Sequence, residues 1–180
     1  MTGDNSGKIY QTVLNQSGVQ TESVAFKEHR SSVEDLQWSP TENSVFASCS
    51  ADHTVKIWDT RNKKRSAVSV RASGTDVNVI SWNKKASYLL ASGHDDGVFS
   101  VWDLRTFRPN QESTPVATFK WHHGPITSIE WHPTEESVLA VSGADNQLTL
   151  WDLSVEPDSE QDGQMTQDDV PPQLPVSYTH

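Results

Sequence analysis

The sequence repeats one pattern three times, and each copy ends on the dipeptide Trp-Asp. The three endings read "HTVKIWD", "GVFSVWD" and "NQLTLWD". In each copy another tryptophan stands twenty residues before the final one, so six of the seven tryptophans fall into one frame. The pairs are Trp38/Trp58, Trp82/Trp102 and Trp131/Trp151. Self-similarity at steps of 44 and then 49 residues indicates a repeat architecture, whose units must stack to bury their apolar faces.

Each copy has the pattern of four short antiparallel strands. Stretches such as "VEDLQW" alternate apolar and polar residues, as half-buried strands do, while "VFASCS" and "VLAVSG" are typical of inner strands. The Trp-Asp strand follows a tight turn, and a further apolar run precedes the next copy ("SVAFKEH" at 23–29, "PVATFKWH" at 115–122). Sheets that are apolar on both faces bury them by stacking in a ring, which is the β-propeller architecture.

We therefore expect an all-β fold, a β-propeller fragment of three near-complete four-stranded blades with a partial blade at the N-terminus. The blades should occupy residues 1–154, with repeats at about 23–61, 66–105 and 115–154. An acidic, proline-containing loop is expected at 155–174. Residues 175–180 ("PVSYTH") are similar to "PVATFKWH" and are expected to form the outer strand of the third blade.

The recurring His, Ser, Asp and Trp resemble WD repeats, in which these four side chains form a hydrogen-bonded chain inside each blade. The resemblance assigns the following residues to these chains: His29, Ser48, Asp52 and Trp58 in the first copy, Ser92, Asp96 and Trp102 in the second, and His122, Asp145 and Trp151 in the third. The second copy has Ser73 where the family has His, and the third has Val141 where it has Ser. We expect the first blade to be the stiffest, and the other two to rely more on apolar packing.

Longer segments narrow the resemblance. "SVEDLQWSPTE" and "PVATFKWHHGPITSIEWHPTEE" resemble the glutamate-rich WD-repeat proteins, a nucleolar ribosome-assembly chaperone family related to the histone-binding WD-repeat chaperones. The resemblance implies a scaffold in the nucleus and nucleolus that binds a basic client, either a large-subunit ribosomal protein or histones. The family has more repeats and an upstream acidic segment, so we expect this chain to be a C-terminal-half fragment or a truncated form.

Composition agrees with a protein-binding role. A single Cys among 180 residues favours a reducing compartment, and no apolar run approaches the roughly 18 residues of a membrane span. The net charge is −10, and residues 155–180 hold six acids with no Lys or Arg. These acids are Glu156, Asp158, Glu160, Asp162, Asp168 and Asp169. Direct binding of nucleic acid is therefore disfavoured, whereas basic proteins are suitable partners.

Further acids fall in turns that should gather on one face of the ring. The stretches expected there are 30–32, 51–54, 73–76, 94–97, 122–125 and 144–146. They carry five aspartates against Arg30: Asp52, Asp76, Asp95, Asp96 and Asp145. We expect a basic client to meet this face together with residues 156–169, which would act as a flexible acidic arm.

Two arginines support a different role. Arg61 and Arg105 each stand two residues after the Asp of a Trp-Asp pair, and proteins with this Trp-Asp-x-Arg ending resemble substrate receptors of a cullin-type ubiquitin ligase. The alternative is that each arginine only caps its strand and pairs with Asp59 or Asp103. The sequence leaves both interpretations open.

The sequence contains no recognisable catalytic, cofactor or metal motif. It has no nucleophile elbow or phosphate loop, and its seven histidines do not stand at metal-ligand spacing beside the cysteine. Cys49 lies in an apolar run and is interpreted as a small core residue. "NKKR" at 62–65 is either a solvated loop or a nuclear-import signal. We expect no enzyme activity, catalytic residue, bound cofactor or metal.

Overall fold

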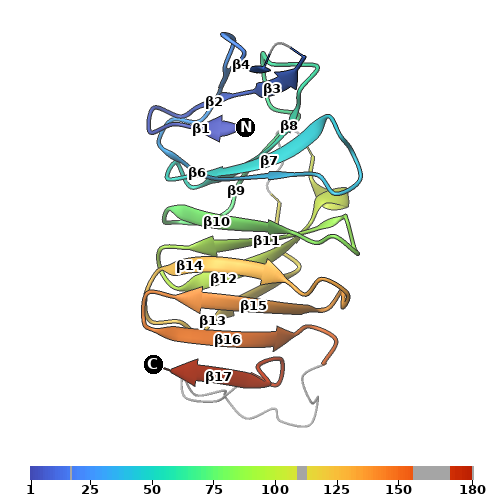
Figure 1. Cartoon of the computed structure of the whole chain (residues 1–180). Helices are drawn as coiled ribbons and strands as arrows, with labels where there is room; N and C mark the ends of the chain where they lie inside the picture. The colour runs from blue at the N-terminus through green and yellow to red at the C-terminus, as the bar shows by residue number, and fades with distance from the viewer. Residues whose placement is uncertain (17, 109–112, 156–170, 180) are drawn as a thin grey trace.

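Three four-stranded antiparallel sheets stack on one another in the structure, a computed structural model that describes residues 1–16, 18–108, 113–155 and 171–179. Figure 1 shows the sheets one above the next. The predicted all-β propeller fold is confirmed. In the described residues the only helix is a short 3-10 turn at Leu104–Thr106.

Every sheet has its strands in chain order, and we call the three sheets blades 1, 2 and 3. Blade 1 consists of β6 (Val33–Trp38), β7 (Val45–Ser50), β8 (Thr54–Asp59) and β9 (Val68–Arg71). Blade 2 consists of β10 (Val77–Trp82), β11 (Leu89–His94), β12 (Val98–Asp103) and β13 (Ala117–Lys120). Blade 3 consists of β14 (Ile126–Trp131), β15 (Val138–Gly143), β16 (Gln147–Asp152) and β17 (Val176–Thr179). Residues 175–180 were expected to supply an outer strand, and β17 pairs with β16 from within that range.

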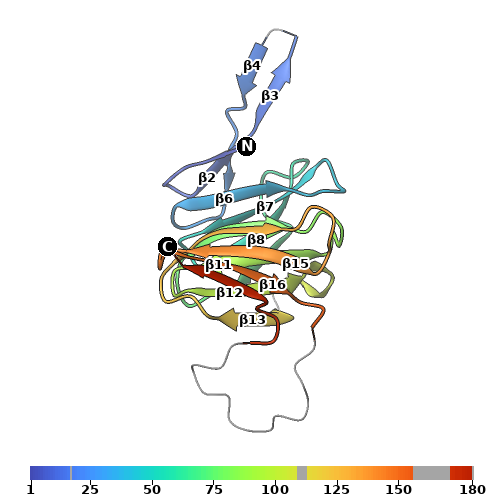
Figure 2. The ribbon, with the colours of Figure 1, turned by 60° about the horizontal axis from the view of Figure 1, so that its bottom comes forward.

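The first 27 residues form a smaller sheet and a hairpin. The sheet, which we call the partial blade, pairs β1 (Thr2–Gly3), β2 (Lys8–Tyr10) and β5 (Phe26–Lys27). Between β2 and β5 the chain runs out into a separate two-stranded hairpin, β3 (Thr12–Asn15) and β4 (Gly18–Thr21). Figure 2 shows this hairpin projecting away from the stacked sheets.

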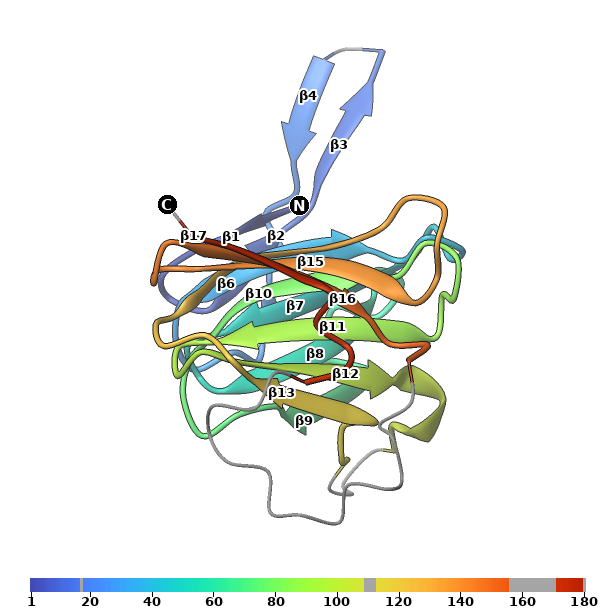
Figure 3. The ribbon, with the colours of Figure 1, turned by 90° about the horizontal axis from the view of Figure 1, so that it is seen from below.

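The apolar core lies between the sheets. The largest fully buried side chains include the three tryptophans of the Trp-Asp strands, Trp58, Trp102 and Trp151. One cluster fills the space between blades 1 and 2, a second lies between blades 2 and 3, and a third joins the partial blade to blade 1. Figure 3, a view down the stack, shows the sheets overlying one another. Each blade thus buries its faces against its neighbours, as the repeat pattern predicts.

Polar side chains also join neighbouring blades at their first strands. Asp35 on β6 accepts a hydrogen bond from the backbone N–H of Ile80 at 3.0 Å, and the side chain of Gln37 accepts one from the N–H of Trp82 at 2.9 Å. Between blades 2 and 3, the indole N–H of Trp131 donates to the carbonyl of Ser81 at 3.0 Å. These bonds satisfy backbone groups on the open edge of each first strand.

The turns between the second and third strands share one backbone conformation. The residue after the turn aspartate has a positive φ in every blade: 69° at His53, 79° at Gly97 and 63° at Asn146. This left-handed conformation is costly for most residues and free for glycine. At Gly97 a Cβ atom would also collide with the carbonyl of His122 in the next blade. The turn of blade 2 therefore packs directly on the loop that enters blade 3.

Candidate protein-binding surfaces and the networks that support them

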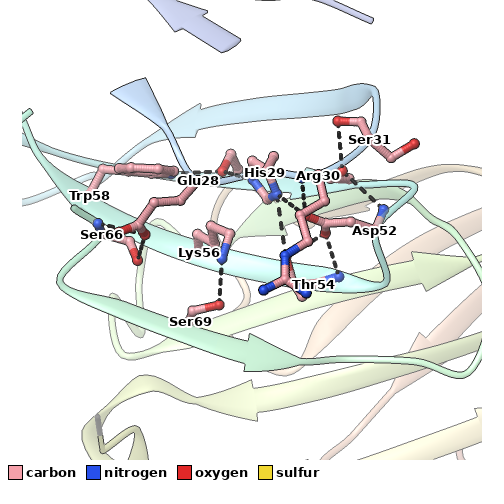
Figure 4. Close-up of polar contacts among 12 residues, drawn as sticks. Glu28, His29, Arg30, Ser31, Asp52, Thr54, Lys56, Trp58, Ser66 and Ser69 are labelled. Atoms are coloured by element: carbon pink, nitrogen blue, oxygen red, sulfur yellow. Dashed lines mark hydrogen bonds and ion pairs between the residues drawn. The ribbon is translucent and has the colours of Figure 1, made fainter. Parts of the chain in front are cut away.

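Blade 1 contains the hydrogen-bonded chain that the WD resemblance implies. The indole N–H of Trp58 donates to Ser48 Oγ at 2.7 Å, and Ser48 Oγ lies 2.7 Å from His29 Nε2. His29 Nδ1 lies 2.9 Å from Asp52 Oδ2. Figure 4 shows the His29 ring directed at Asp52, with Thr54 beside them. The chain ties the loop before β6 to β7, to β8 and to the turn between them.

Blade 2 forms an equivalent chain with a different histidine. The indole N–H of Trp102 donates to Ser92 Oγ at 2.9 Å, and Ser92 Oγ lies 2.9 Å from His94 Nε2. The His94 side chain comes from β11 itself and is only 2% exposed. Ser73 hydrogen-bonds with Thr75 in its own loop, and Asp96 accepts a hydrogen bond from the N–H of Val98. Blade 2 therefore has its imidazole, without the carboxylate behind it.

Blade 3 replaces the hydroxyl group in the same manner. Thr149 Oγ1, from β16, accepts the indole N–H of Trp151 at 2.8 Å and lies 3.0 Å from His122 Nε2. His122 Nδ1 lies 3.0 Å from Asp145 Oδ1. Val141, which stands at the family's serine position, is fully buried.

Blades 2 and 3 therefore also form buried networks, although each lacks the family's residue at one position; that blade 1 is the stiffest and that the other two rely more on apolar packing stays a prediction. Each missing member is supplied from a position two residues along the same strand from a member of its own network: His94 beside Ser92, and Thr149 beside Trp151. Residues two apart on a strand point to the same face. This alternation is the signal in the sequence that could have located both replacements.

The networks hold different charges. Burial alone would raise the pKa of Asp52, but hydrogen bonds from His29, Thr54 and the N–H of Arg30 bring it well below its usual value. The pKa of Asp145 is lowered in the same way by His122 and by backbone N–H groups, again against the effect of burial. Burial lowers the pKa of His94 to about 4, which Asp96 only partly opposes. At neutral pH blades 1 and 3 thus contain a carboxylate, whereas the imidazole of blade 2 is neutral.

The turns and entry loops that were expected to share a face do adjoin one another, and we call this side the turn face. Within each blade the turn bonds to the entry loop through one backbone hydrogen bond. These bonds are Ala51 N–H to Ser32 O, Asp95 N–H to Asp76 O, and Ala144 N–H to Pro125 O. The turn face lies on the left side of the stack in Figure 1.

Most acids of the turn face serve the fold. Asp52 and Asp145 are bonded to histidines, and Asp96 to a backbone N–H. Asp76 is 49% exposed, 3.8 Å from His53, and Asp95 accepts a long 3.4 Å bond from Asn78. The turn face therefore offers three exposed or half-exposed aspartates to a partner, Asp76, Asp95 and Asp96, which is fewer than the five in the sequence.

A second group of acids lies at the opposite ends of the blade 3 strands, which we call the loop edge. Glu130, Glu135 and Glu136 are exposed there, and Asp152 ends β16 nearby. The six acids from Glu156 to Asp169, expected to form an arm, lie outside the described residues. The chain leaves the described part of blade 3 at Val155, three residues after Asp152.

Arg61 and Arg105 occupy equivalent places on the loop edges of blades 1 and 2. Each guanidinium binds both oxygens of the preceding aspartate: Arg61 holds Asp59 and Arg105 holds Asp103, with N–O distances between 2.5 and 3.1 Å. Arg105 also stacks on the Tyr88 ring at 3.8 Å. The arginine side chains remain 75% and 65% exposed. The capping interpretation is thus correct as geometry, and the remaining N–H donors still face solvent.

Cys49 and the segment 62–65 were also considered in the sequence, and they lie in the core and in a surface loop. Cys49 is fully buried in β7, and burial raises the pKa of its thiol. In the segment 62–65, Lys63 pairs with Glu22 while Lys64 and Arg65 are exposed. Among the described residues no group of three His, Cys, Asp or Glu side chains is placed to hold a metal ion. The same part of the chain has no helix able to span a membrane.

Comparison with known proteins gives matches to the same repeats. Residues 20–59, 66–103 and 113–152 match the WD40 family, described as WD domain, G-beta repeat. The chain is 56% identical over 180 residues to ribosome assembly protein rrb1 of Schizosaccharomyces pombe, covering 97% of this chain and 38% of that protein.

Two further relatives cover smaller parts. Histone-binding protein MSI1 of Saccharomyces cerevisiae is 35% identical over 135 residues, 74% of this chain and 31% of MSI1. Glutamate-rich WD repeat-containing protein 1 of Dictyostelium discoideum is 53% identical over 70 residues, 39% of this chain and 14% of that protein. The predicted resemblance to glutamate-rich and histone-binding WD-repeat proteins is confirmed. The chain spans less than two fifths of the length of each of these relatives.

Proposed function

Because the chain belongs to the WD40 repeat family, we propose that it is a non-catalytic scaffold that binds and chaperones a basic protein client during assembly. The client is a large-subunit ribosomal protein or a histone. The stacked blades are held by buried networks and apolar layers, so the surface loops can vary without disturbing the fold. This combination of a rigid support and variable loops suits a protein-binding platform.

The observation that carries the proposal is the uneven distribution of charge. Residues 1–90 contain 11 Lys and Arg against 9 Asp and Glu, whereas residues 91–180 contain 3 against 15. The acids available to a partner accumulate on the loop edge of blade 3, where the chain continues into the acidic stretch 156–169. A basic client is attracted to the blade 3 end of the stack and not to the blade 1 end.

The names of the relatives agree with this role. One is a ribosome assembly protein and another is histone-binding. They support the proposed location of the chain in the nucleus and nucleolus.

The test is binding of the chain to purified histones H3–H4 and to a basic large-subunit ribosomal protein by surface plasmon resonance. We expect affinity to fall steeply between about 0.05 and 0.5 M salt, because screening weakens attraction between exposed charges. Deleting 156–169 should lower the association rate more than it raises the dissociation rate. Affinity that does not respond to salt would contradict the charge-based mechanism.

A matched pair of variants locates the contact. Glu135→Lys on blade 3 and Glu42→Lys on blade 1 change the same position of the loop between the first and second strands, and both glutamates are exposed. We expect Glu135→Lys to weaken client binding several-fold and Glu42→Lys to leave it nearly unchanged. Equal effects would place the client elsewhere.

A second candidate function is docking to a cullin-type ubiquitin ligase through Arg61 and Arg105. It is favoured by the equivalent, exposed positions of the two guanidiniums on adjacent blades. Their charges are offset by Asp59 and Asp103, so docking would depend on the remaining N–H donors and not on net positive charge. Replacing both arginines with Ala should abolish co-purification with the ligase and preserve client binding. Unchanged recovery of the ligase would exclude this function.

A further inference from the structure

The β3–β4 hairpin has features that neither the fold nor the proposed function uses. All eight of its strand residues are exposed. Figure 2 shows it standing clear of the sheets. An isolated two-stranded hairpin is at best marginally stable in water, and three or more strands are needed for independent stability. The hairpin is therefore a surface that gains stability from a further strand.

The base of the hairpin is fixed to the body. The N–H of Glu22 donates to the carbonyl of Gln11 at 2.8 Å, and the Glu22 side chain pairs with Lys63 of blade 1. The Lys63 ammonium in turn lies 5.5 Å from the centre of the Phe26 ring. The strands are thus presented at a defined place on the molecule.

The register shows which backbone groups point outward. Residues pair as Thr12–Thr21, Val13–Gln20, Leu14–Val19 and Asn15–Gly18. In an antiparallel pair, hydrogen-bonded and non-hydrogen-bonded residue pairs alternate. Since Gln11 and Glu22 are hydrogen-bonded, Leu14 and Val19 form a non-bonded pair, two steps beyond Thr12 and Thr21. The N–H and C=O groups of Leu14 and Val19 therefore point to the two outer edges of the hairpin.

The same two residues also carry the exposed apolar surface. Leu14 is 79% exposed and Val19 is 74% exposed, opposite one another on one face. Thr12 and Thr21 share that face, with their hydroxyls 3.1 Å apart. Residues 11–21 contain no Lys, Arg, Asp, Glu or Pro, the residues that usually protect sheet edges from pairing. The hairpin thus has two unprotected edges beside an apolar face.

We propose that two copies of this chain associate through their β3–β4 hairpins, which pair edge to edge about a two-fold axis into one four-stranded sheet. Such pairing is isologous, since the same edge serves both copies. The resulting sheet gathers the Leu14 and Val19 side chains of both copies on one face. The hairpin is uncharged and projects from the end of the chain that is not acidic, so two copies of a chain of net charge −10 can meet there while the acids of their third blades stay far apart.

The contact surface is small, so the dimer is weak and transient, as interfaces well under about 1,200 Å² usually are. Its salt dependence is opposite in sign to that of client binding. Salt screens the repulsion between two chains of the same net charge, so raising the salt concentration should strengthen association.

The experiment is sedimentation equilibrium of the full chain, from about 10 to 500 μM, at about 0.05 and 0.5 M salt. We expect a concentration-dependent dimer that is tighter at the higher salt. The variant Leu14→Lys/Val19→Lys should raise the dimer dissociation constant at least about tenfold, because edge charges oppose strand pairing. Val24→Lys is the matched control, since Val24 is also exposed but lies outside both strands.

The outcomes separate clearly. A parent chain that stays monomeric at both salts overturns the proposal, and so does a dimer that survives the double substitution. A dimer lost equally in Val24→Lys also overturns it, because added charge alone would then explain the loss. Circular dichroism confirms that each variant is folded.

Discussion

Blades 1 and 2 bury the same indole against the same hydroxyl but take their imidazoles from different places. In blade 1 the ring enters from the loop before the sheet and is backed by Asp52. In blade 2 the ring of His94 enters from the second strand, with no carboxylate bonded to it. The comparison teaches that the fold requires a partner at a point in space, and that more than one sequence position can reach that point. In blade 3 the same holds for the hydroxyl group, which Thr149 on the third strand supplies in place of a serine on the second.

The largest expected effect tests whether the buried indole contributes equally to stability in blades 1 and 2. Trp58→Ala and Trp102→Ala each remove a buried indole and leave the serine hydroxyl that accepts its N–H without that donor, so each should cost about 3–5 kcal/mol. Chemical denaturation followed by circular dichroism measures both. If Trp102→Ala costs far less than Trp58→Ala, then His94 does not complete the blade 2 network.

Lowering the pH should destabilise blade 2 before it destabilises blades 1 and 3. Unfolded histidine titrates near pH 6.5, whereas folding lowers the pKa of His94 to about 4. Between these values the unfolded chain binds a proton that the folded chain does not, so blade 2 loses up to about 3 kcal/mol as pH falls from 6.5 to 4. The pKa values of Asp52 and Asp145 are lowered by folding from the usual value of an aspartate, about 4. The stabilisation that these two carboxylates provide is therefore lost only below about pH 4.

Hydrogen exchange at pH 7 and pH 5 resolves this difference by blade. Amides of β11 and β12 should lose protection before those of β7 and β8. His94→Gln keeps a hydrogen-bonding group near Ser92 and removes the titration, so its stability should no longer fall over that range. A fall of the same size in His94→Gln would assign the effect to another group.

A smaller effect tests the substitution in blade 3. Thr149→Val leaves the indole of Trp151 and the imidazole of His122 without their shared hydroxyl, which should cost about 1–3 kcal/mol. The double variant Thr149→Val/Val141→Ser returns a hydroxyl at the position that Ser48 holds in blade 1. Thermal unfolding should show that it recovers most of the loss. No recovery would mean that position 141 cannot reach the indole in this blade.

The smallest effect concerns the arginines. Arg61→Ala and Arg105→Ala break exposed pairs, so each should shift the unfolding midpoint by less than about 2 °C. Arg105→Ala should have the larger shift, because its guanidinium also lies over Tyr88. Calorimetry under low salt measures the difference. A shift of many degrees would mean that the pairs support the fold and are unsuitable for a docking test.

The sequence predicts the repeat, the strands and the blade 1 network because each of these follows from spacing and alternation. It does not predict His94 or Thr149, since the WD pattern fixes where residues stand in the chain and not which side chains converge. The β3–β4 hairpin is absent from the prediction for another reason. Its residues pack against no core, so residues 12–21 carry no burial pattern that ties them to a blade. The distribution of acids between structural and free roles likewise depends on bonds that only the folded chain reveals.

The hydrogen bonds that connect the first strands of neighbouring blades have an evolutionary consequence. Neighbouring blades are linked there by a few side chains, such as Asp35 and Gln37, and not by a continuous hydrogen-bonded ladder. A gene segment that encodes one blade can therefore be duplicated, lost or exchanged as a module. At each new junction these polar contacts and the apolar layer between the sheets must then be refitted by selection, while the hydrogen-bonded ladders within the blade are inherited intact.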